Sequence, residues 1–107
     1  MQGLIRQGDV LLVPIATAPQ GKIVKPGKRG HVLAEGEATG HAHTIREQEG
    51  VKLISKGQAD ELRLWLLVEA PVELEHQEHA TLTIPPGSYE VRRQREYSPE
   101  AIRRVTD

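Results

Sequence analysis

The sequence contains no cysteine and no phenylalanine, and its aromatic residues are limited to Trp65, Tyr89 and Tyr97. Without cysteine the chain cannot form a disulfide scaffold, a zinc site with thiolate ligands or a cysteine nucleophile. With so few aromatic rings, the core must be built from valine, leucine and isoleucine. No apolar run approaches the roughly 18 to 20 residues that cross a bilayer, and the N-terminus lacks the features of a signal peptide. We therefore expect a cytoplasmic protein that does not associate with membranes.

An excess of one charge is also missing, because 14 lysines and arginines balance 15 acidic residues and leave a formal net charge of −1. This balance argues against a protein that coats nucleic acid, although a local basic patch remains compatible with it. The length of 107 residues suits one domain, and 27% charged with 37% apolar residues is typical of a globular one. We predict a single domain over residues 1–107.

Ten glycines and seven prolines divide the chain into short segments rich in aliphatic and β-branched residues. Strands are predicted over residues 9–15, 31–35, 40–45, 51–54, 61–69, 72–75, 80–84 and 88–95. Strands at such short spacing are typical of a small barrel or a two-sheet sandwich. Residues 22–30 predict a mobile or hairpin-like loop. Ser98 followed by Pro99 predicts the start of a short C-terminal helix, so the expected fold is all-β with one terminal helix. The apolar positions predict a core of Val10, Leu12, Val32, Leu64, Leu66, Leu82, Ile84 and Val91.

Four of the five histidines lie in two short clusters, His41-Ala42-His43 and His76-Gln77-Glu78-His79. On a strand, residues two apart share a face, so His41 and His43 should point the same way. Two imidazoles on one face can chelate a divalent ion if further ligands reach them. We expect His76 or His79 to supply a third ligand, and Glu47 or Glu90 a carboxylate. Such ligands suit Zn, Fe, Mn, Ni or Cu. The alternative is that the histidines are ordinary strand and turn residues without a ligand.

The segment GHAHTIRE, residues 40–47, resembles the first motif of the cupin family, with His41, His43 and Glu47 on the positions that bind metal in cupins. Pro85-Pro86-Gly87 is similar to the P-x-G of the second cupin motif, although Glu90 stands where cupins have histidine. The resemblance implies a cupin-like barrel that binds a divalent transition metal. The whole chain is also similar to a group of short uncharacterised bacterial and phage proteins, from which no activity follows.

Two further hypotheses rest on charge. Arg92, Arg93 and Arg95 lie close to the C-terminus and, together with the basic loop, could contact phosphates as a nucleic-acid-binding module. Alternatively, the acidic stretch 69–78 pairs with basic segments of another copy in a non-enzymatic assembly. The small aliphatic core and the edge strands favour a homo-oligomer in either case. No catalytic residue and no small-molecule ligand is indicated by the sequence.

Overall fold

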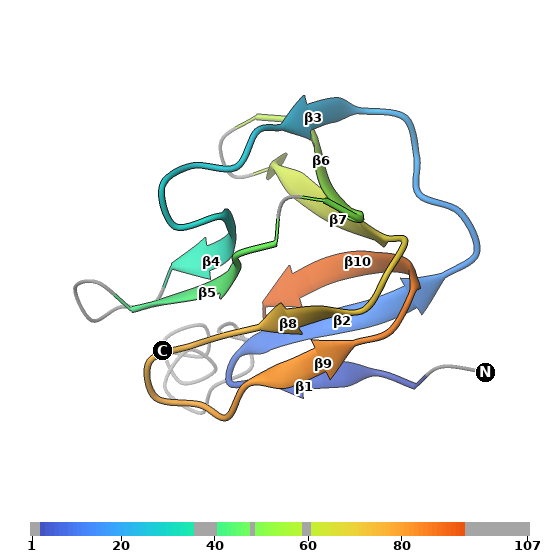
Figure 1. Cartoon of the computed structure of the whole chain (residues 1–107). Coiled ribbons are helices and arrows are strands. Elements are labelled where there is room, and N and C mark those ends of the chain that lie inside the picture. The colour runs from blue at the N-terminus through green and yellow to red at the C-terminus, as the bar shows by residue number, and fades with distance from the viewer. Residues whose placement is uncertain (1–2, 36–40, 48, 59–60, 94–107) are drawn as a thin grey trace, which may run out of the picture.

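The computed structural model describes residues 3–35, 41–47, 49–58 and 61–93, which contain ten β-strands (Figure 1). The strands are β1 (Ile5–Gln7), β2 (Val10–Ile15), β3 (Lys22–Val24), β4 (His31–Glu35), β5 (Ala42–Ile45), β6 (Val51–Lys56), β7 (Arg63–Val68), β8 (Val72–Leu74), β9 (Leu82–Ile84) and β10 (Gly87–Arg93). The all-β prediction is confirmed. The helix predicted from Ser98 lies outside the described residues. Within the described ranges, no helix has the length and apolar character needed to cross a membrane.

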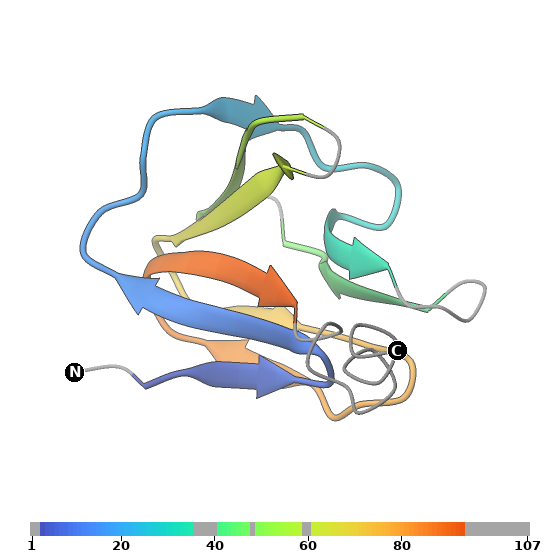
Figure 2. The ribbon, with the colours of Figure 1, turned by 180° about the vertical axis from the view of Figure 1, so that it is seen from behind.

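Six of the strands form one antiparallel sheet in the order β1-β2-β10-β7-β6-β3. The other four form two hairpins, β4-β5 and β8-β9. Thr44 and Glu75 join the hairpins by exchanging backbone hydrogen bonds of 2.9 and 2.8 Å. The views from front and back show the hairpins gathered on one side of the large sheet (Figures 1 and 2). The molecule is therefore a layer of two hairpins on a six-stranded sheet.

The six-stranded sheet does not close into a barrel. Of the two predicted architectures, a small barrel and a two-sheet sandwich, the barrel is therefore wrong, and so is the cupin-like form of it. β1 and β3 lie at opposite edges of the sheet, and each is three residues long. Closure would require the two edge strands to pair with each other along their length. Instead, the two hairpins cover one face of the open sheet.

The core between the sheet and the hairpins is aliphatic, apart from Tyr89, which is fully buried and donates a hydrogen bond of 2.6 Å to the carbonyl of Pro85. Of the predicted core residues, four are buried: Val10, Leu12, Leu66 and Ile84. Leu64 and Val91 are half-buried against this core, and Val32 and Leu82 are half-buried elsewhere. All eight predicted strands are present, within a few residues of their expected ends. The prediction missed β1 and β3, because three residues are too few to show a period of two.

His31 on β4 is buried, and within the described part of the chain neither of its ring nitrogens has a hydrogen-bond partner. Burial lowers the pKa of His31 from its ordinary value of 6.5. The unfolded chain therefore takes up a proton at a pH where the folded protein does not, so stability falls as the pH drops below 6.5.

We expect His31→Leu to raise the free energy of unfolding by about 1 kcal/mol at pH 8, because it removes an unsatisfied buried polar ring. The gain should be larger at pH 5.5. At that pH the unfolded wild type binds a proton at His31 that the folded wild type does not, which lowers the free energy of unfolding of the wild type and not of the variant. Urea denaturation at the two pH values measures both effects. A variant that is less stable than the wild type at both pH values would contradict this account of His31.

Candidate metal centre

The two histidine clusters of the sequence come together in space. His41 lies just before β5 and His43 is the second residue of that strand, while His76 and His79 lie in the connection between β8 and β9. The ring centroid of His76 is 4.4 Å from that of His43, 4.7 Å from that of His79 and 5.8 Å from that of His41. The rings of His43 and His79 are nearly parallel, with centroids 6.2 Å apart. His76 is thus at the middle of a cluster of four imidazoles.

The end of β1 and the turn that follows it supply two residues to this cluster that the sequence analysis did not identify, Gln7 and Asp9. The Gln7 side chain is buried, and its amide nitrogen donates hydrogen bonds to the carbonyls of Leu74 and Ala80 at 2.8 and 2.9 Å. Its amide oxygen must therefore accept, and Nδ1 of His43 lies 2.8 Å from it. In this network Nδ1 of His43 carries the proton, which leaves the lone pair of the neutral ring on Nε2.

The Nε2 atom of His43 faces Oδ1 of Asp9 at 3.2 Å. Burial lowers the pKa of His43, the nearby His76 lowers it further, and the opposing effect of Asp9 does not reverse the shift. Burial would raise the pKa of Asp9, but the hydrogen bonds and charge of Arg93, together with the contact to His43, outweigh this effect and lower the pKa. Gln7 and Asp9 thus place an oxygen atom at each of the two ring nitrogens of His43.

Arg93 fixes the carboxylate of Asp9 from the side away from His43. Its Nε and one terminal nitrogen contact Oδ2 of Asp9 at 3.2 and 2.9 Å. The same guanidinium donates to the carbonyl of Glu35 at 3.0 Å. One carboxylate oxygen of Asp9 is thus held by Arg93, and the other remains directed at the imidazole.

Glu78 contacts two of the remaining histidines. Its Oε1 lies 3.1 Å from Nδ1 of His41, a contact that favours the proton on Nδ1 and a free lone pair on Nε2. Its backbone N–H donates to Nδ1 of His76 at 3.0 Å, so the neutral ring of His76 carries its proton on Nε2. Burial and the neighbouring His79 lower the pKa of His76. His41 therefore directs its Nδ1 at Glu78, whereas ligation through Nδ1 of His76 requires release of the Glu78 amide.

Gly8 lets the ring of His79 approach the β1–β2 turn. Gly8 has a φ of 58°, and a Cβ atom placed there would lie 2.6 Å from Nε2 of His79. A glycine at this position thus brings Nε2 of His79 against the turn that carries Gln7 and Asp9.

Neither of the two predicted carboxylate ligands joins the cluster. Glu47 lies after β5, where its carboxylate accepts a hydrogen bond of 2.7 Å from the backbone N–H of Glu73. Glu90 is on β10, where alternation places it on the face of the sheet opposite the core residues Tyr89 and Val91. Its carboxylate forms ion pairs with Arg63 and Arg92, the latter at 2.5 Å.

The predicted nucleic-acid residues are also separated by the fold. Arg92 pairs with Glu90 on one face of the sheet, while Arg93 faces the other way and contacts Asp9. Arg95 lies outside the described residues. The described part of this arginine run is therefore divided between the two faces of β10.

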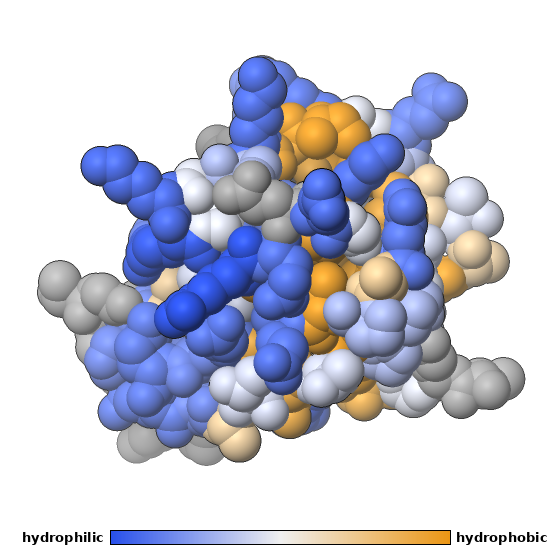
Figure 3. Space-filling view, in the orientation of Figure 1, coloured by the Kyte–Doolittle hydropathy of each residue, from blue (hydrophilic) through white to orange (hydrophobic). Residues whose placement is uncertain are grey.

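The side chains of the cluster lie close together, but they do not have the arrangement of metal ligands. Among the described residues, no group of three or more His, Asp or Glu side chains is already positioned to hold a metal ion. Ligation therefore requires rotation of imidazoles in the β8–β9 connection, a segment that contains no strand residues. The surface over β5 and this connection is strongly hydrophilic (Figure 3), which is consistent with access from solvent.

The comparison with known proteins gives one match. The profile of a family described as "Domain of unknown function (DUF8820)" matches residues 6–94, which include the whole histidine cluster. No curated protein and no solved structure matches the chain. The resemblance to cupins and to short bacterial and phage proteins stays a prediction.

Proposed function

We propose that this chain, which belongs to the DUF8820 family of domains of unknown function, binds one divalent transition metal ion at the histidine cluster. His43 and Asp9 are its fixed ligands. His41, His76 and His79 supply the remaining donors. In this proposal, Asp9 of the β1–β2 turn takes the place of the predicted carboxylates, Glu47 and Glu90.

The contact between His43 and Asp9 carries the proposal. With its proton on Nδ1, a neutral His43 directs its lone pair at the carboxylate of Asp9, and this contact is favourable only when a proton or a metal ion lies between the two atoms. A metal ion in that position forms a coordinate bond to each of them. Two ligands about 2.0 to 2.2 Å from one ion are roughly 3.3 to 3.6 Å apart at the tetrahedral angle. His43 Nε2 and Asp9 Oδ1, at 3.2 Å, are close to this separation.

The spacing of the rings supports a single ion. Imidazoles that bind one ion through nitrogen at about 2.0 Å have centroids roughly 4.5 to 6.5 Å apart, depending on the angle between them. The four neighbouring pairs of rings have centroid distances of 4.4, 4.7, 5.8 and 6.2 Å. These separations are compatible with rings that bind one ion once their nitrogens turn toward it.

The partners behind the ligands also suit a metal centre. Ligating histidines usually donate their second ring N–H to an amide, carbonyl or carboxylate, which fixes the tautomer and the ring plane. Gln7 does this for His43, and Glu78 is placed to do it for His41. Arg93 orients Asp9 in the same way. Imidazoles with one carboxylate suit Zn, Fe, Ni and Cu, and such a site can keep a position open for water.

The test is titration of the purified protein with Zn²⁺, Ni²⁺ and Co²⁺ by isothermal calorimetry and thermal unfolding. We expect binding of one ion per chain. At a free concentration about a hundred times the Kd, bound metal should raise the Tm by roughly 10 °C. A protein that purifies without metal, and whose Tm none of these ions moves, would overturn the proposal.

The variant Asp9→Asn tests the contact between His43 and Asp9 separately from the titration. The side-chain amide of asparagine can donate to Nε2 of His43 and still accept from Arg93. We therefore expect the affinity for metal to fall at least about tenfold, while the metal-free variant is as stable as the wild type or more so. If the metal-free variant is instead clearly destabilised, Asp9 and His43 attract each other without metal, and the argument for an ion between them fails.

A further inference from the structure

A concave site lies beside the two hairpins. It is a pocket of about 430 Å³ lined by Lys28, Arg29, Gly30, Thr44, Arg46 and Gln77. Thr44 follows His43 on β5, and successive side chains of a strand point to opposite faces. β5 thus separates this pocket from the ring of His43, so the inference drawn from it does not depend on the metal centre.

Three of the lining residues are cationic, and no acidic residue is among the six. Two carboxylates hold the arginines without neutralising the wall completely. Glu35 binds one terminal nitrogen of Arg29 at 2.7 Å, and Glu75 contacts Nε of Arg46 at 3.4 Å. Each guanidinium has five N–H groups in a planar fork, so donors of both remain available to a ligand.

The neutral lining residues add further donors. The amide oxygen of Gln77 accepts from the backbone N–H of Ala42 at 2.9 Å, so the other end of the amide, its NH₂ group, is left to donate. Thr44 contributes a hydroxyl, which can donate as well as accept. The pocket therefore offers donors and positive charge from several directions.

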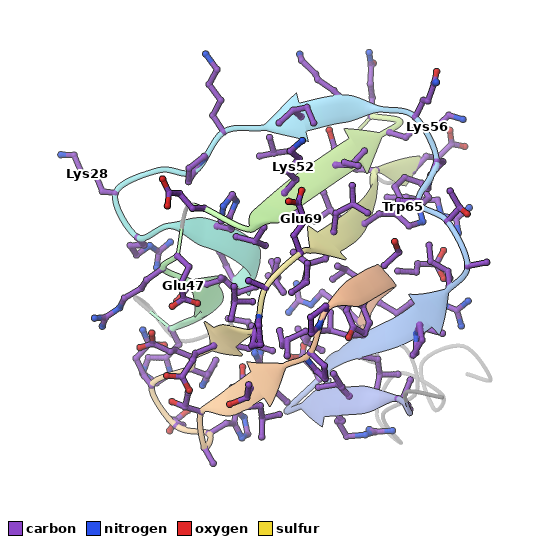
Figure 4. The ribbon with its side chains drawn as sticks, turned by 45° about the vertical axis from the view of Figure 1, so that its right-hand side comes forward. Lys28, Glu47, Lys52, Lys56, Trp65 and Glu69 are labelled. Carbon is purple, nitrogen blue, oxygen red and sulfur yellow. The ribbon has the colours of Figure 1, made fainter. Side chains whose placement is uncertain are left out.

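A tight turn presents the two basic residues of this wall. Gly27 and Gly30 exchange backbone hydrogen bonds of 3.0 and 3.1 Å, which leaves Lys28 and Arg29 at the tip. Gly30 has a φ of 87°, and a Cβ atom there would lie 2.3 Å from the carbonyl oxygen of Ile45. Only glycine allows the turn to lie this close to β5. Lys28 projects from the turn at the edge of the molecule (Figure 4).

We infer that this pocket binds the phosphate group of a small phosphorylated molecule. A phosphomonoester has about two negative charges and three acceptor oxygens at neutral pH, which matches several cationic and neutral donors better than a carboxylate does. The volume of the pocket lies within the range of roughly 300 to 1,000 Å³ that is typical of small-ligand sites. The pocket can therefore hold a molecule larger than an isolated phosphate ion.

The inference is tested by titrating the ¹⁵N-labelled protein, without added metal, with inorganic phosphate, ribose 5-phosphate and ribose. We expect the amide signals of the 27–30 turn, Thr44, Arg46 and Gln77 to shift with ribose 5-phosphate and not with ribose. Lys28→Gln and Arg46→Gln should each weaken binding about tenfold, as expected for loss of a charge-assisted hydrogen bond. Lys52→Gln, a change at an exposed lysine on β6, should leave it unchanged (Figure 4).

Three results would overturn the inference. Ribose could shift the same signals as ribose 5-phosphate, or Lys52→Gln could weaken binding as much as Arg46→Gln does. A single-stranded oligonucleotide could bind where ribose 5-phosphate does not, which would assign the pocket to a nucleic-acid backbone instead. Because no metal is added, none of these results bears on the metal centre.

Discussion

Replacing His43 by alanine should weaken the binding of divalent metal at least about a hundredfold, the largest loss of any single histidine in the cluster. His43 is the ring whose tautomer and position the fold determines most completely. Gln7 fixes its Nδ1, β5 buries it to 1% exposure, and Asp9 faces its Nε2. Mutation of a residue that hydrogen-bonds to a metal ligand typically reduces the affinity for metal 10- to 100-fold. Loss of His43, a proposed ligand itself, should therefore reduce the affinity by at least the upper end of that range.

His76→Ala should reduce affinity less than His43→Ala, because Nδ1 of His76 accepts the amide of Glu78, a hydrogen bond that ligation through this ring would give up. Isothermal calorimetry with Zn²⁺ measures both variants. His31→Leu is the matched control, since His31 is also buried but lies on β4, outside the cluster. If His31→Leu lost metal as completely as His43→Ala, the effect would come from the fold and not from ligation.

Gly30→Ala should lower the free energy of unfolding by about 3 kcal/mol or more. At a φ of 87° an alanine is strained by about 1 to 2 kcal/mol. Its Cβ would also meet two backbone atoms, the carbonyl oxygen of Ile45 at 2.3 Å and Cα of Arg46 at 2.8 Å. These atoms belong to β5 and the residue after it, so relief of the overlap requires the 27–30 turn to move away from the hairpin.

Gly27→Ala is the control within the same turn. Gly27 also takes part in the paired hydrogen bonds of the turn, but a Cβ atom at Gly27 has nothing within 4 Å. Urea denaturation should show a change below about 1 kcal/mol for this variant. Equal destabilisation by both alanines would mean that the turn tolerates no side chain at all, and would contradict the specific role assigned to the contact with β5.

The local pattern of the sequence was enough to predict most of the strands and half of the cluster. Alternation marks the strands because the period of two depends only on neighbouring residues. The same rule predicted His41 and His43 on one face, and the concentration of histidines near residue 41 and residue 76 singled out two segments whose rings lie close together in the structure. Glu47 and Glu90 were predicted as the carboxylate ligands, and the structure gives both carboxylates other partners.

Gln7 and Asp9 could not be found in this way, because their role depends on the order of the strands. Gln7 is 36 residues from His43 in the chain and 67 from Leu74, and no local pattern relates these positions. The one sequence signal was a polar turn, Gln7-Gly8-Asp9, before an apolar strand, which is common in soluble proteins.

The sequence by itself therefore determined the elements and the residue types available for a metal centre, since strand formation and side-chain alternation are local. The tertiary structure alone decided which of them meet. Pairing of β1 with β2 and the bridge from Thr44 to Glu75 bring the β1–β2 turn, β5 and the β8–β9 connection to one place. The same pairings leave the sheet open and direct Asp9, rather than Glu47 or Glu90, at His43. Long-range register is set by burying the apolar faces of all these strands in one core, which is a property of the whole chain.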